Sequence, residues 1–352
     1  MKKLVALTLV LCMVLALAAC GGASAPAATE PKADAPAADA PAADAPAAPE
    51  VTEAPLNWPE GDINVLIPAN TGGDTDTTFR TFSTSIGETL GTNVMLTNMS
   101  GGAGAIALNE LLDYDPDGYT AMWHHYDSII LSMKGEMDGT YEEVLDIAAV
   151  IPVSGGNYVL TVNKASGWET LEDFVTYCNE HPGEVVWAIE AGGWSQVFAA
   201  YMVKVLNVDV TLVDFGSSSD RNAALLGGQA HVLLGSASNL NSYPDDFMAL
   251  GSCSLERQPA VPDVPTFKEM GYGDVESTKF YYFSFKEGTD PRILDKMGEA
   301  IKVALDTEEG KAVMDKYYYL DYEVLTGDAA YEYLANFVKT YEPFVMEMLA
   351  NS

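Results

Sequence analysis

The chain has 352 residues, 48% of them hydrophobic and 20% charged, which is enough apolar material for a sizeable core and excludes wholesale disorder. Its 18 Lys and Arg against 51 Asp and Glu give a net charge of −33, which would repel a phosphate backbone and argues against nucleic acid as a partner. Four cysteines without a CxxC pair and only four histidines argue against a zinc site, a redox motif or a His-based catalytic cluster, so we expect neither a metal nor a cofactor.

The N-terminal segment has the pattern of an export signal. Lys2 and Lys3 precede an uncharged apolar run, 4–19, which is short for a membrane span and suits the core of a signal peptide over 1–19. The run ends Leu-Ala-Ala-Cys, with Cys20 followed by two glycines, and this resembles a bacterial lipobox. The lipobox implies that Cys20 is lipidated and becomes the mature N-terminus. An ordinary signal peptide with an incidental cysteine is the alternative.

Residues 20–56 begin with this cysteine and continue as a segment of Ala, Pro and acidic residues that cannot form a core. The composition predicts a disordered tether. If it is largely extended at about 3.1 Å per residue, its span has an upper bound of roughly 110 Å. The tether would hold the rest of the chain away from the membrane.

The remaining 296 residues exceed the usual size of one hydrophobic core, so we expect two domains. The apolar run 63–67 predicts a strand buried on both faces, and a turn-rich segment follows it. Phe79, Phe82, Ile86 and Leu90 form one stripe of a helix that Gly91 is placed to end.

This strand–loop–helix pattern recurs along the chain and predicts an α/β fold with mostly parallel sheets. We expect a helix capped by Thr170, and another that begins near Ser195. Pro343 is expected to kink or end the last helix. The other expected strands are 93–97, 119–123, 184–189, 231–234 and 247–250, and the other expected helices are 105–112, 220–226, 294–305 and 331–341.

Three glycine-containing loops each join a predicted strand to a helix. In the first, 68–76, successive N–H groups can converge where the helix dipole is positive, which suits a carboxylate. The alternative is a plain turn in which Asp74, Thr75 or Asp76 is the N-cap. The second loop, 102–107, fits G-x-G-x-x-A, but an exported protein meets little NAD, and the first strand of the chain is elsewhere.

The third glycine loop, 190–195, lies in the expected second lobe. Two such loops, facing each other across a cleft, could hold a ligand without any nucleophile. The enzyme alternative is weaker, because Ser195 lacks the G-x-S-x-G frame of a nucleophile elbow. His124 and the next residue point to opposite faces of a strand, which suits a core or cleft-lining role better than catalysis. Cys178 and Cys253 suit the core, and a disulfide between them remains open.

Several motifs in this order resemble the receptors of tripartite tricarboxylate transporters, also called Bug-type solute-binding proteins. The resemblance covers nearly all of the chain after the tether. The motifs are Trp58-Pro59, Gly72-Gly73-Asp74-Thr75-Asp76, Arg80, the Pro-Asp-Gly-Tyr-Thr of 116–120, the Asn-Glu-His-Pro-Gly of 179–183, the Leu-Leu-Gly-Gly-Gln of 225–229 and the Pro-Asp-Val-Pro-Thr of 262–266.

The resemblance implies a two-lobed, type II periplasmic-binding-protein (Venus-flytrap) fold, with domain 1 at 57–156 plus 279–352 and domain 2 at 157–278. It implies a non-enzymatic receptor on the outer face of the bacterial cytoplasmic membrane. The receptor would bind a small organic acid or amino-acid-like solute and dock on a membrane permease. An extracytoplasmic hydrolase, or a sensing subunit of a signalling system, is the alternative. The expected ligand-binding residues are Ala69, Asn70, Thr71, Gly72, Gly73, Asp74, Thr75, Asp76, Trp123, His124, Glu190, Ala191, Gly192, Gly193, Trp194, Ser195 and Gln196.

Three positions depart from the pattern of that family. Relatives usually have Gly or Ser at Asp74, Gly at Trp194 and His at Phe198, so a simple tricarboxylate is disfavoured. At about 4 Å and an effective dielectric near 20, two like charges repel by roughly 4 kcal/mol. We therefore expect either that Asp74 turns outward as a helix cap, or that the ligand carries an amino group or an aromatic body. Trp123, Trp194 and the aromatic run 280–282 are candidates for an aromatic wall, although core packing explains each equally well.

Overall fold

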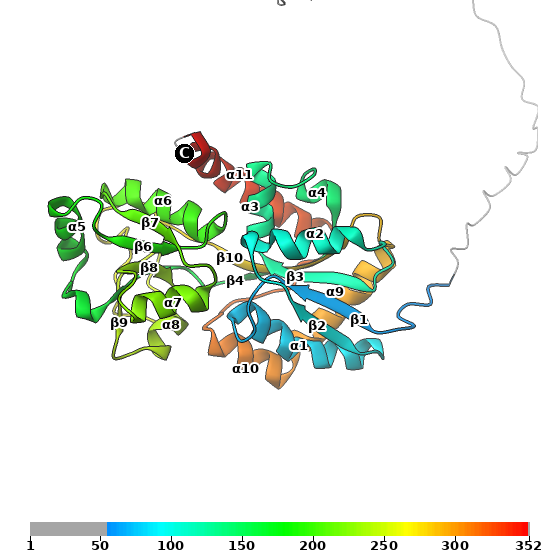
Figure 1. Cartoon of the computed structure of the whole chain (residues 1–352). Coiled ribbons are helices and arrows are strands. Elements are labelled where there is room, and N and C mark those ends of the chain that lie inside the picture. Colours follow the sequence, from blue (N-terminus) through cyan, green and yellow to red (C-terminus); the bar gives the residue numbers. More distant parts are fainter. Residues whose placement is uncertain (1–54, 351–352) are drawn as a thin grey trace, which may run out of the picture. The chain divides into compact units, whose positions relative to one another are not determined.

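The computed structural model describes residues 55–350, so the expected signal peptide, Cys20 and nearly all of the tether lie outside the described residues. The described chain builds two five-stranded sheets (Figure 1). The first has the order β2-β1-β3-β10-β4 and the second the order β7-β6-β8-β5-β9. In each sheet four strands share one direction, and one strand, β10 or β5, runs antiparallel to its neighbours. The predicted α/β fold with two mostly parallel sheets is confirmed.

The first sheet takes strands from both ends of the described chain. Its strands are β1 (Ile63–Ile67), β2 (Val94–Asn98), β3 (Thr120–His125), β4 (Leu145–Val153) and β10 (Lys279–Lys286). Helices α1 (Asp74–Leu90), α9 (Pro291–Asp306) and α10 (Glu308–Lys316) pack on one face, and α2 (Ala105–Asp113), α3 (Asp127–Lys134), α4 (Tyr141–Val144) and α11 (Asp328–Ala350) lie on the other. Side chains on both faces of β1 are therefore buried, as its continuous apolar run predicts.

The second sheet lies between β4 and β10 in the sequence. Its strands are β5 (Val159–Asn163), β6 (Val186–Ile189), β7 (Thr211–Asp214), β8 (Val232–Gly235) and β9 (Phe247–Ser252). Helices α5 (Leu171–Glu180) and α6 (Trp194–Leu206) cover one face, and α7 (Ser218–Leu226) and α8 (Ala237–Ser242) cover the other. The chain crosses between the sheets at 154–158 and again at 253–278.

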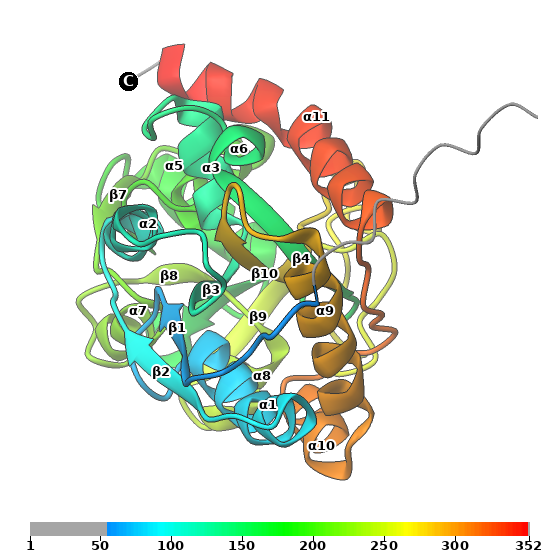
Figure 2. The ribbon, with the colours of Figure 1, turned by 90° about the vertical axis from the view of Figure 1, so that its right-hand side faces the viewer.

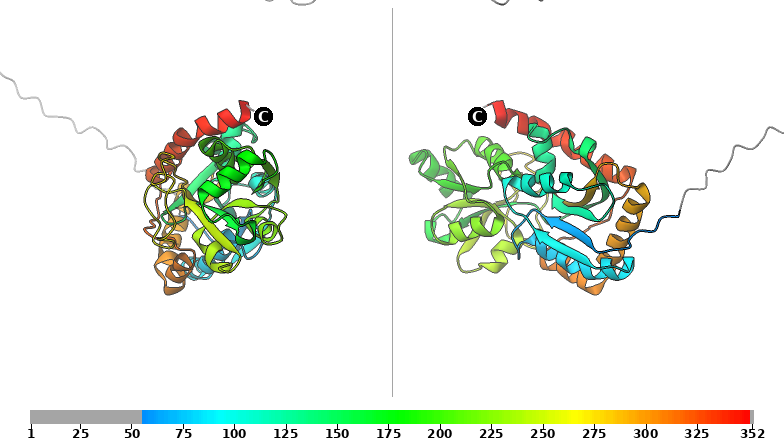
Figure 3. Two further views of the ribbon diagram at one scale, coloured as in Figure 1. Left: turned by 90° about the vertical axis from the view of Figure 1, so that its left-hand side faces the viewer. Right: turned by 45° about the vertical axis from the view of Figure 1, so that its right-hand side comes forward.

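One hydrophobic core continues from the first sheet into the second. Side chains of α3 and α11 pack on the first sheet and also reach α6, which covers the second sheet. Figure 2 labels α11, the red C-terminal helix, which is also seen at the edge of the molecule in Figure 3. The two lobes are therefore joined by apolar packing as well as by the two crossing segments.

The helix ends test the local sequence signals. Helix α1 ends where expected, because Gly91 adopts a left-handed conformation at φ 72°. Thr170 caps α5, as expected, by accepting a hydrogen bond from the amide of Asp173. Of the two expectations for Pro343, an end of the last helix is wrong, because α11 runs through it to Ala350, and a kink stays a prediction. Beyond the proline, the side chain of Val345 is buried in the core, and this packing stabilises the final turns.

No helix in the described part of the chain is both long enough and apolar enough to cross a membrane.

Substitution of Gly298 tests how closely α9 packs on the first sheet. A Cβ atom at this position would lie 2.8 Å from Thr326 Cγ2 and 2.9 Å from the carbonyl oxygen of Ala148. Gly298→Ala should therefore destabilise the fold by about 1–3 kcal/mol despite its better helix propensity. The measurement is the free energy of unfolding in denaturant. Glu299→Ala, on the exposed side of the same helix, is the control and should change it by less than about 0.5 kcal/mol.

Candidate functional site

A cavity of about 670 Å³ lies between the two sheets. Its walls are the loops that follow β1, β2 and β3 in the first lobe and the loops that follow β6, β7 and β8 in the second. The carboxyl ends of parallel strands meet at one edge of a sheet, so both sheets turn this edge toward the same space. Lys279, at the start of β10, and the segment 316–318 complete the wall.

Hydrogen bonds join the two lobes at two points of the cavity wall. The side-chain amide of Asn70 donates to Ser217 Oγ at 3.1 Å, joining the loop before α1 to the start of α7. The side-chain amide of Asn241 donates to the hydroxyl of Tyr318 at 2.7 Å. The lobes are therefore in contact in this structure.

The loop before α1 places a helix N-terminus at the cavity. The N-cap is Gly73, not Asp74, Thr75 or Asp76 as the alternative proposed. Asp76 instead turns back, accepting the amide of Gly72 at 2.9 Å and pairing with Arg80. The first amides of an α-helix have no partner inside the helix. Asp74 and Thr75 line the cavity, so we expect their amides to be available to a bound anion.

The carboxylate of Asp74 is held inside the protein. It forms an ion pair with Lys279 and accepts hydrogen bonds from the hydroxyls of Tyr281 and Tyr319, each at 3.0 Å. Burial alone would raise the pKa of Asp74, but the charge and hydrogen bond of Lys279 outweigh burial and hold that pKa well below its usual value. The expectation that Asp74 turns outward as a helix cap is wrong, because Lys279 neutralises its charge in place.

The loop before α6 was expected to bind the solute through its backbone amides, but these amides have other partners in the structure. The amide of Ala191 donates to Asp214 at 3.1 Å, and the amide of Gly192 donates to Gln196 at 2.8 Å. The amide of Trp194 donates at 2.7 Å to Asp127, a residue of the other lobe. The loop amides thus already have acceptors within the protein, so solute binding by residues 190–196 stays a prediction.

Asp127 lies in a group of titratable and charged side chains that includes His125, Glu190 and Arg221. The ring nitrogen Nδ1 of His125 lies 3.3 Å from Asp127 Oδ2, and Arg221 Nη1 lies 3.4 Å from Glu190 Oε2. Burial raises the pKa of Asp127, although the Trp194 amide and Arg221 oppose it. Burial and the charge of Asp127 raise the pKa of Glu190. Burial and Lys279 lower the pKa of His125 to about 4, so this imidazole is neutral at neutral pH.

A second helix N-terminus, that of α7, faces the cavity from the other lobe. Its N-cap, Ser217, accepts the amide of Asp220, and the next residues, Ser218 and Ser219, line the cavity. This helix lies opposite α1, because Asn70 bonds directly to Ser217. The sequence predicted α6 as the helix that faces α1, but the first amide of α6 already donates to Asp127, and the structure places the start of α7 beside the loop before α1.

The expected site residues fall into two groups. The cavity is lined by Ala69, Asn70, Gly72, Gly73, Asp74, Thr75, Glu190, Ala191 and Ser195. Lying off the cavity are Thr71, Asp76, Trp123, His124, Gly192, Gly193, Trp194 and Gln196.

The aromatic and histidine candidates are core residues. Trp123 is fully buried and stacks on Tyr281 with ring centroids 5.1 Å apart. His124 is buried between the hydroxyls of Ser128 and Ser284, at 2.7 and 2.9 Å. Their neighbour His125 lines the cavity, in keeping with the opposite orientation of adjacent residues on a strand. The aromatic residues that line the cavity are Tyr126, Tyr158, Tyr243, Tyr317 and Tyr318.

The remaining candidates for chemistry show no reactive arrangement. Cys178 and Cys253 are free and buried, which answers the open question of a disulfide between them. Within residues 55–350 no group of three or more His, Cys, Asp or Glu side chains is placed to hold a metal ion.

Residues 78–338 match the tripartite tricarboxylate transporter family receptor. The chain belongs to this family. BugT of Bordetella pertussis is 25% identical over 267 residues, which cover 74% of this chain and 80% of BugT. The sequence resemblance to this family is therefore confirmed, and the family is one of extracytoplasmic solute-binding receptors, not enzymes.

Solved structures of similar proteins show the same two-lobed fold. The periplasmic binding protein BugD superimposes with a TM-score of 0.72 at 22% identity, covering 84% of this receptor and 98% of BugD. MatC from Rhodopseudomonas palustris, solved with bound malate, gives a TM-score of 0.71 at 22% identity, covering 82% of this receptor and all of MatC, 100%. The expected periplasmic-binding-protein fold is confirmed.

The buried acids make a pH-dependent prediction. Asp127 and Glu190 titrate near 4 when unfolded, and burial moves their pKa values to about 6 and about 7 in the receptor. The folded state then binds more protons than the unfolded state across this window, so stability from these groups falls as pH rises through it. Asp127→Asn cannot ionise and keeps an oxygen acceptor for the Trp194 amide. We expect its free energy of unfolding, relative to wild type, to increase between pH 5 and pH 8 by on the order of 2 kcal/mol.

The measurement is denaturant unfolding of both proteins at each pH. The exposed Asp138→Asn makes the same charge change and is the matched control, for which we expect a curve parallel to wild type. A parallel curve for Asp127→Asn would contradict the burial of an ionised carboxylate at this position.

Proposed function

We propose that the receptor captures a small organic acid in the cavity between its lobes, with the solute carboxylate between the N-termini of α1 and α7. The observation that carries this proposal is the pair of helix starts at one cavity, joined by the bond between Asn70 and Ser217. Each helix end contributes first-turn amides and a positive dipole end. MatC, a relative of the same fold, was solved with malate.

The charges at the cavity favour a solute that carries little net negative charge. Five carboxylates and three cationic side chains line it; the carboxylates are Asp74, Asp127, Glu190, Asp214 and Asp220, and the cations are Arg221, Lys279 and Lys316. Two of the cations are already paired, with Asp74 and Glu190. We therefore propose a monocarboxylate or a zwitterion, such as a hydroxy acid or an amino acid, in preference to a tricarboxylate.

The rest of the cavity wall suits a polar solute body. Hydroxyl and amide side chains at the starts of α7 and α8 line it, among them Ser219, Asn222, Ser236, Ser238 and Asn239. These groups donate and accept hydrogen bonds without carrying charge. A solute with hydroxyl or amino substituents would replace the water that these groups otherwise bind.

The cellular role follows from the family and from the N-terminal sequence. We propose that the lobes are 57–156 with 279–352, and 157–278, and that they close on the solute and deliver it to a membrane permease. We also propose that lipidated Cys20 anchors the receptor to the outer face of the cytoplasmic membrane. No polybasic patch is available there to assist, so retention would depend on the acyl chains.

The solute class is tested by thermal unfolding with a panel of acids. Lactate, malate, glutamate, succinate and citrate at 10 mM differ in net charge and in polar substituents. A ligand at a hundredfold excess over its dissociation constant stabilises the folded state by about 2.7 kcal/mol. We expect a rise in melting temperature with the hydroxy monocarboxylate lactate or with the amino acid glutamate, and none with the tricarboxylate citrate. A rise with citrate alone would contradict the charge argument.

The role of the α7 N-terminus is tested with a proline. Ser218 is the first residue of α7, and Ser217 before it is extended, so proline fits there without loss of the helix. Ser218→Pro removes one amide donor, and Ser218→Ala removes only the hydroxyl. Because a hydrogen bond to a charged group contributes about 1.5–3 kcal/mol, we expect Ser218→Pro to weaken binding of the best acid by ten- to a hundredfold. Calorimetric titration should show less than a threefold change for Ser218→Ala, and equal losses in both variants would contradict an amide contact.

A further inference from the structure

A second cavity, of about 290 Å³, lies on the other side of the lobe contact and shares no lining residue with the first. Helix α6 of the second lobe and helix α11 of the first lobe form two of its walls, and the segment after β9 forms the third. Its lining residues are Trp194, Val197, Phe198, Tyr201, Leu255, Asp274, Glu276, Thr340, Tyr341 and Phe344.

The helical walls of this second cavity are aromatic. The ring of Tyr201 lies 5.5 Å from that of Phe198 and 4.9 Å from that of Phe344, between centroids. Trp194 lies 5.3 Å from Phe198 and 4.8 Å from Tyr341. Phe344 is 36% exposed although large and apolar, so this aromatic surface is open to solvent at its rim. An aromatic face is electrostatically negative, and this cavity gathers five aromatic rings.

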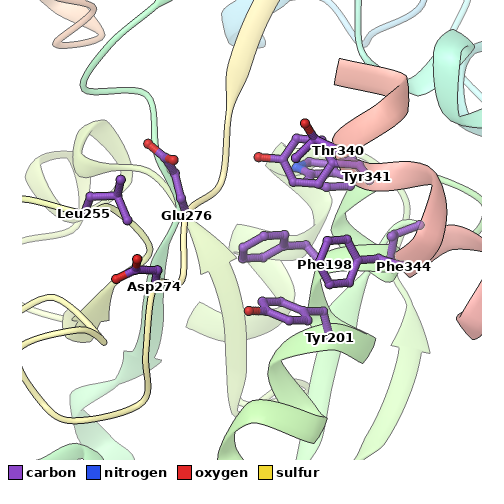
Figure 4. A pocket seen from close by; sticks show the side chains of 10 residues that line it. Phe198, Tyr201, Leu255, Asp274, Glu276, Thr340, Tyr341 and Phe344 are labelled. Carbon is purple, nitrogen blue, oxygen red and sulfur yellow. The ribbon is translucent and has the colours of Figure 1, made fainter. Parts of the chain in front are cut away.

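The wall opposite the rings carries two carboxylates. Figure 4 shows the side chains of Asp274 and Glu276 on one side of the cavity, and Phe198, Tyr201, Tyr341 and Phe344 on the other. Asp274 pairs with Lys268 at 2.8 Å. Glu276 is in no ion pair within residues 55–350, and no cationic side chain lines the cavity in that range. An apolar space bounded by aromatic faces and carboxylates suits a positive charge on an apolar body.

We propose that this cavity binds a small organic cation, a quaternary or alkylated ammonium group on a short apolar body. The aromatic rings would contact the alkyl groups around the nitrogen, and Glu276 and Asp274 would supply the counter-charge. The volume is at the small end of the usual range for ligand cavities and admits a solute of choline size. The binding site is distinct from the site proposed for the acid, and its test does not depend on that proposal.

The test is calorimetric titration of the full chain with choline and with 3,3-dimethyl-1-butanol, which has the same shape without the charge. We expect choline to bind at one site and at least ten times more tightly than the neutral alcohol. Equal affinity for the two would overturn the proposal, since it would show apolar filling alone. No heat and no thermal shift with choline up to 50 mM would also overturn it.

Two variants locate the site. Glu276→Gln removes the unpaired carboxylate, and Phe344→Leu removes an aromatic face while keeping an apolar side chain. Each should weaken choline binding by fivefold or more. Glu332→Gln makes the same charge change at an exposed position of α11 and should leave choline affinity within twofold. Melting temperatures of the three variants report whether each still folds. Equal losses of choline affinity in Glu276→Gln and Glu332→Gln would show a general effect of the net negative charge and contradict a site at this cavity.

Discussion

One residue at the start of α6, Trp194, makes both a hydrogen bond and ring contacts between the lobes of this receptor. The amide of Trp194 donates to Asp127 in the other lobe, and its indole ring packs against Tyr126, Phe337 and Tyr341, which belong to the first lobe. Exposing about 200 Å² of such a ring would cost about 5 kcal/mol at 25 cal/mol per Å². Separating the lobes at Trp194 is therefore energetically unfavourable. We expect the lobes to open by rotation about this residue. The cavity between the two sheets lies on one side of this contact, and the second, aromatic cavity lies on the other.

Charge pairing explains how so acidic a chain can bind an anion. Two of the five cavity carboxylates lie beside a cation, because Lys279 neutralises Asp74 and Arg221 lies next to Glu190. Exposed charges elsewhere are screened over about 8 Å at physiological salt, whereas a closed cavity is governed by its own donors. The positive dipole ends of α1 and α7 add a favourable contribution for an anion at the cavity. The net charge of −33 mainly affects the rate at which an anion approaches.

Local sequence signals predicted the frame of the site, and contacts between distant residues decided its chemistry. The run 63–67, the stripe on α1 and the stop at Gly91 were sufficient to place the first loop at a helix N-terminus. The partner of Asp74 could not be predicted in this way, because Lys279 is 205 residues away and meets it only when β10 joins the first sheet. The aromatic run on β10 was equally ambiguous. A central strand covered on both faces buries every side chain, so Phe280 and Tyr281 carry no alternation that would separate core from cavity.

The position of Asp127 also explains why the solute should differ from a tricarboxylate. A carboxylate of the protein itself already occupies the first amide of α6, where the family resemblance placed a carboxylate of the solute. In the proposed binding mode one solute carboxylate would lie at the first-turn amides of α1 and α7, but a second one directed toward α6 would meet Asp127 and Glu190. At about 4 Å and an effective dielectric near 20 this repulsion is roughly 4 kcal/mol, or about a thousandfold in affinity. An ammonium or hydroxyl group at the same place would instead donate a hydrogen bond to those carboxylates. The carboxylate of Asp127 would therefore disfavour a negative charge at one end of the solute. The other end of the cavity would still suit an anion.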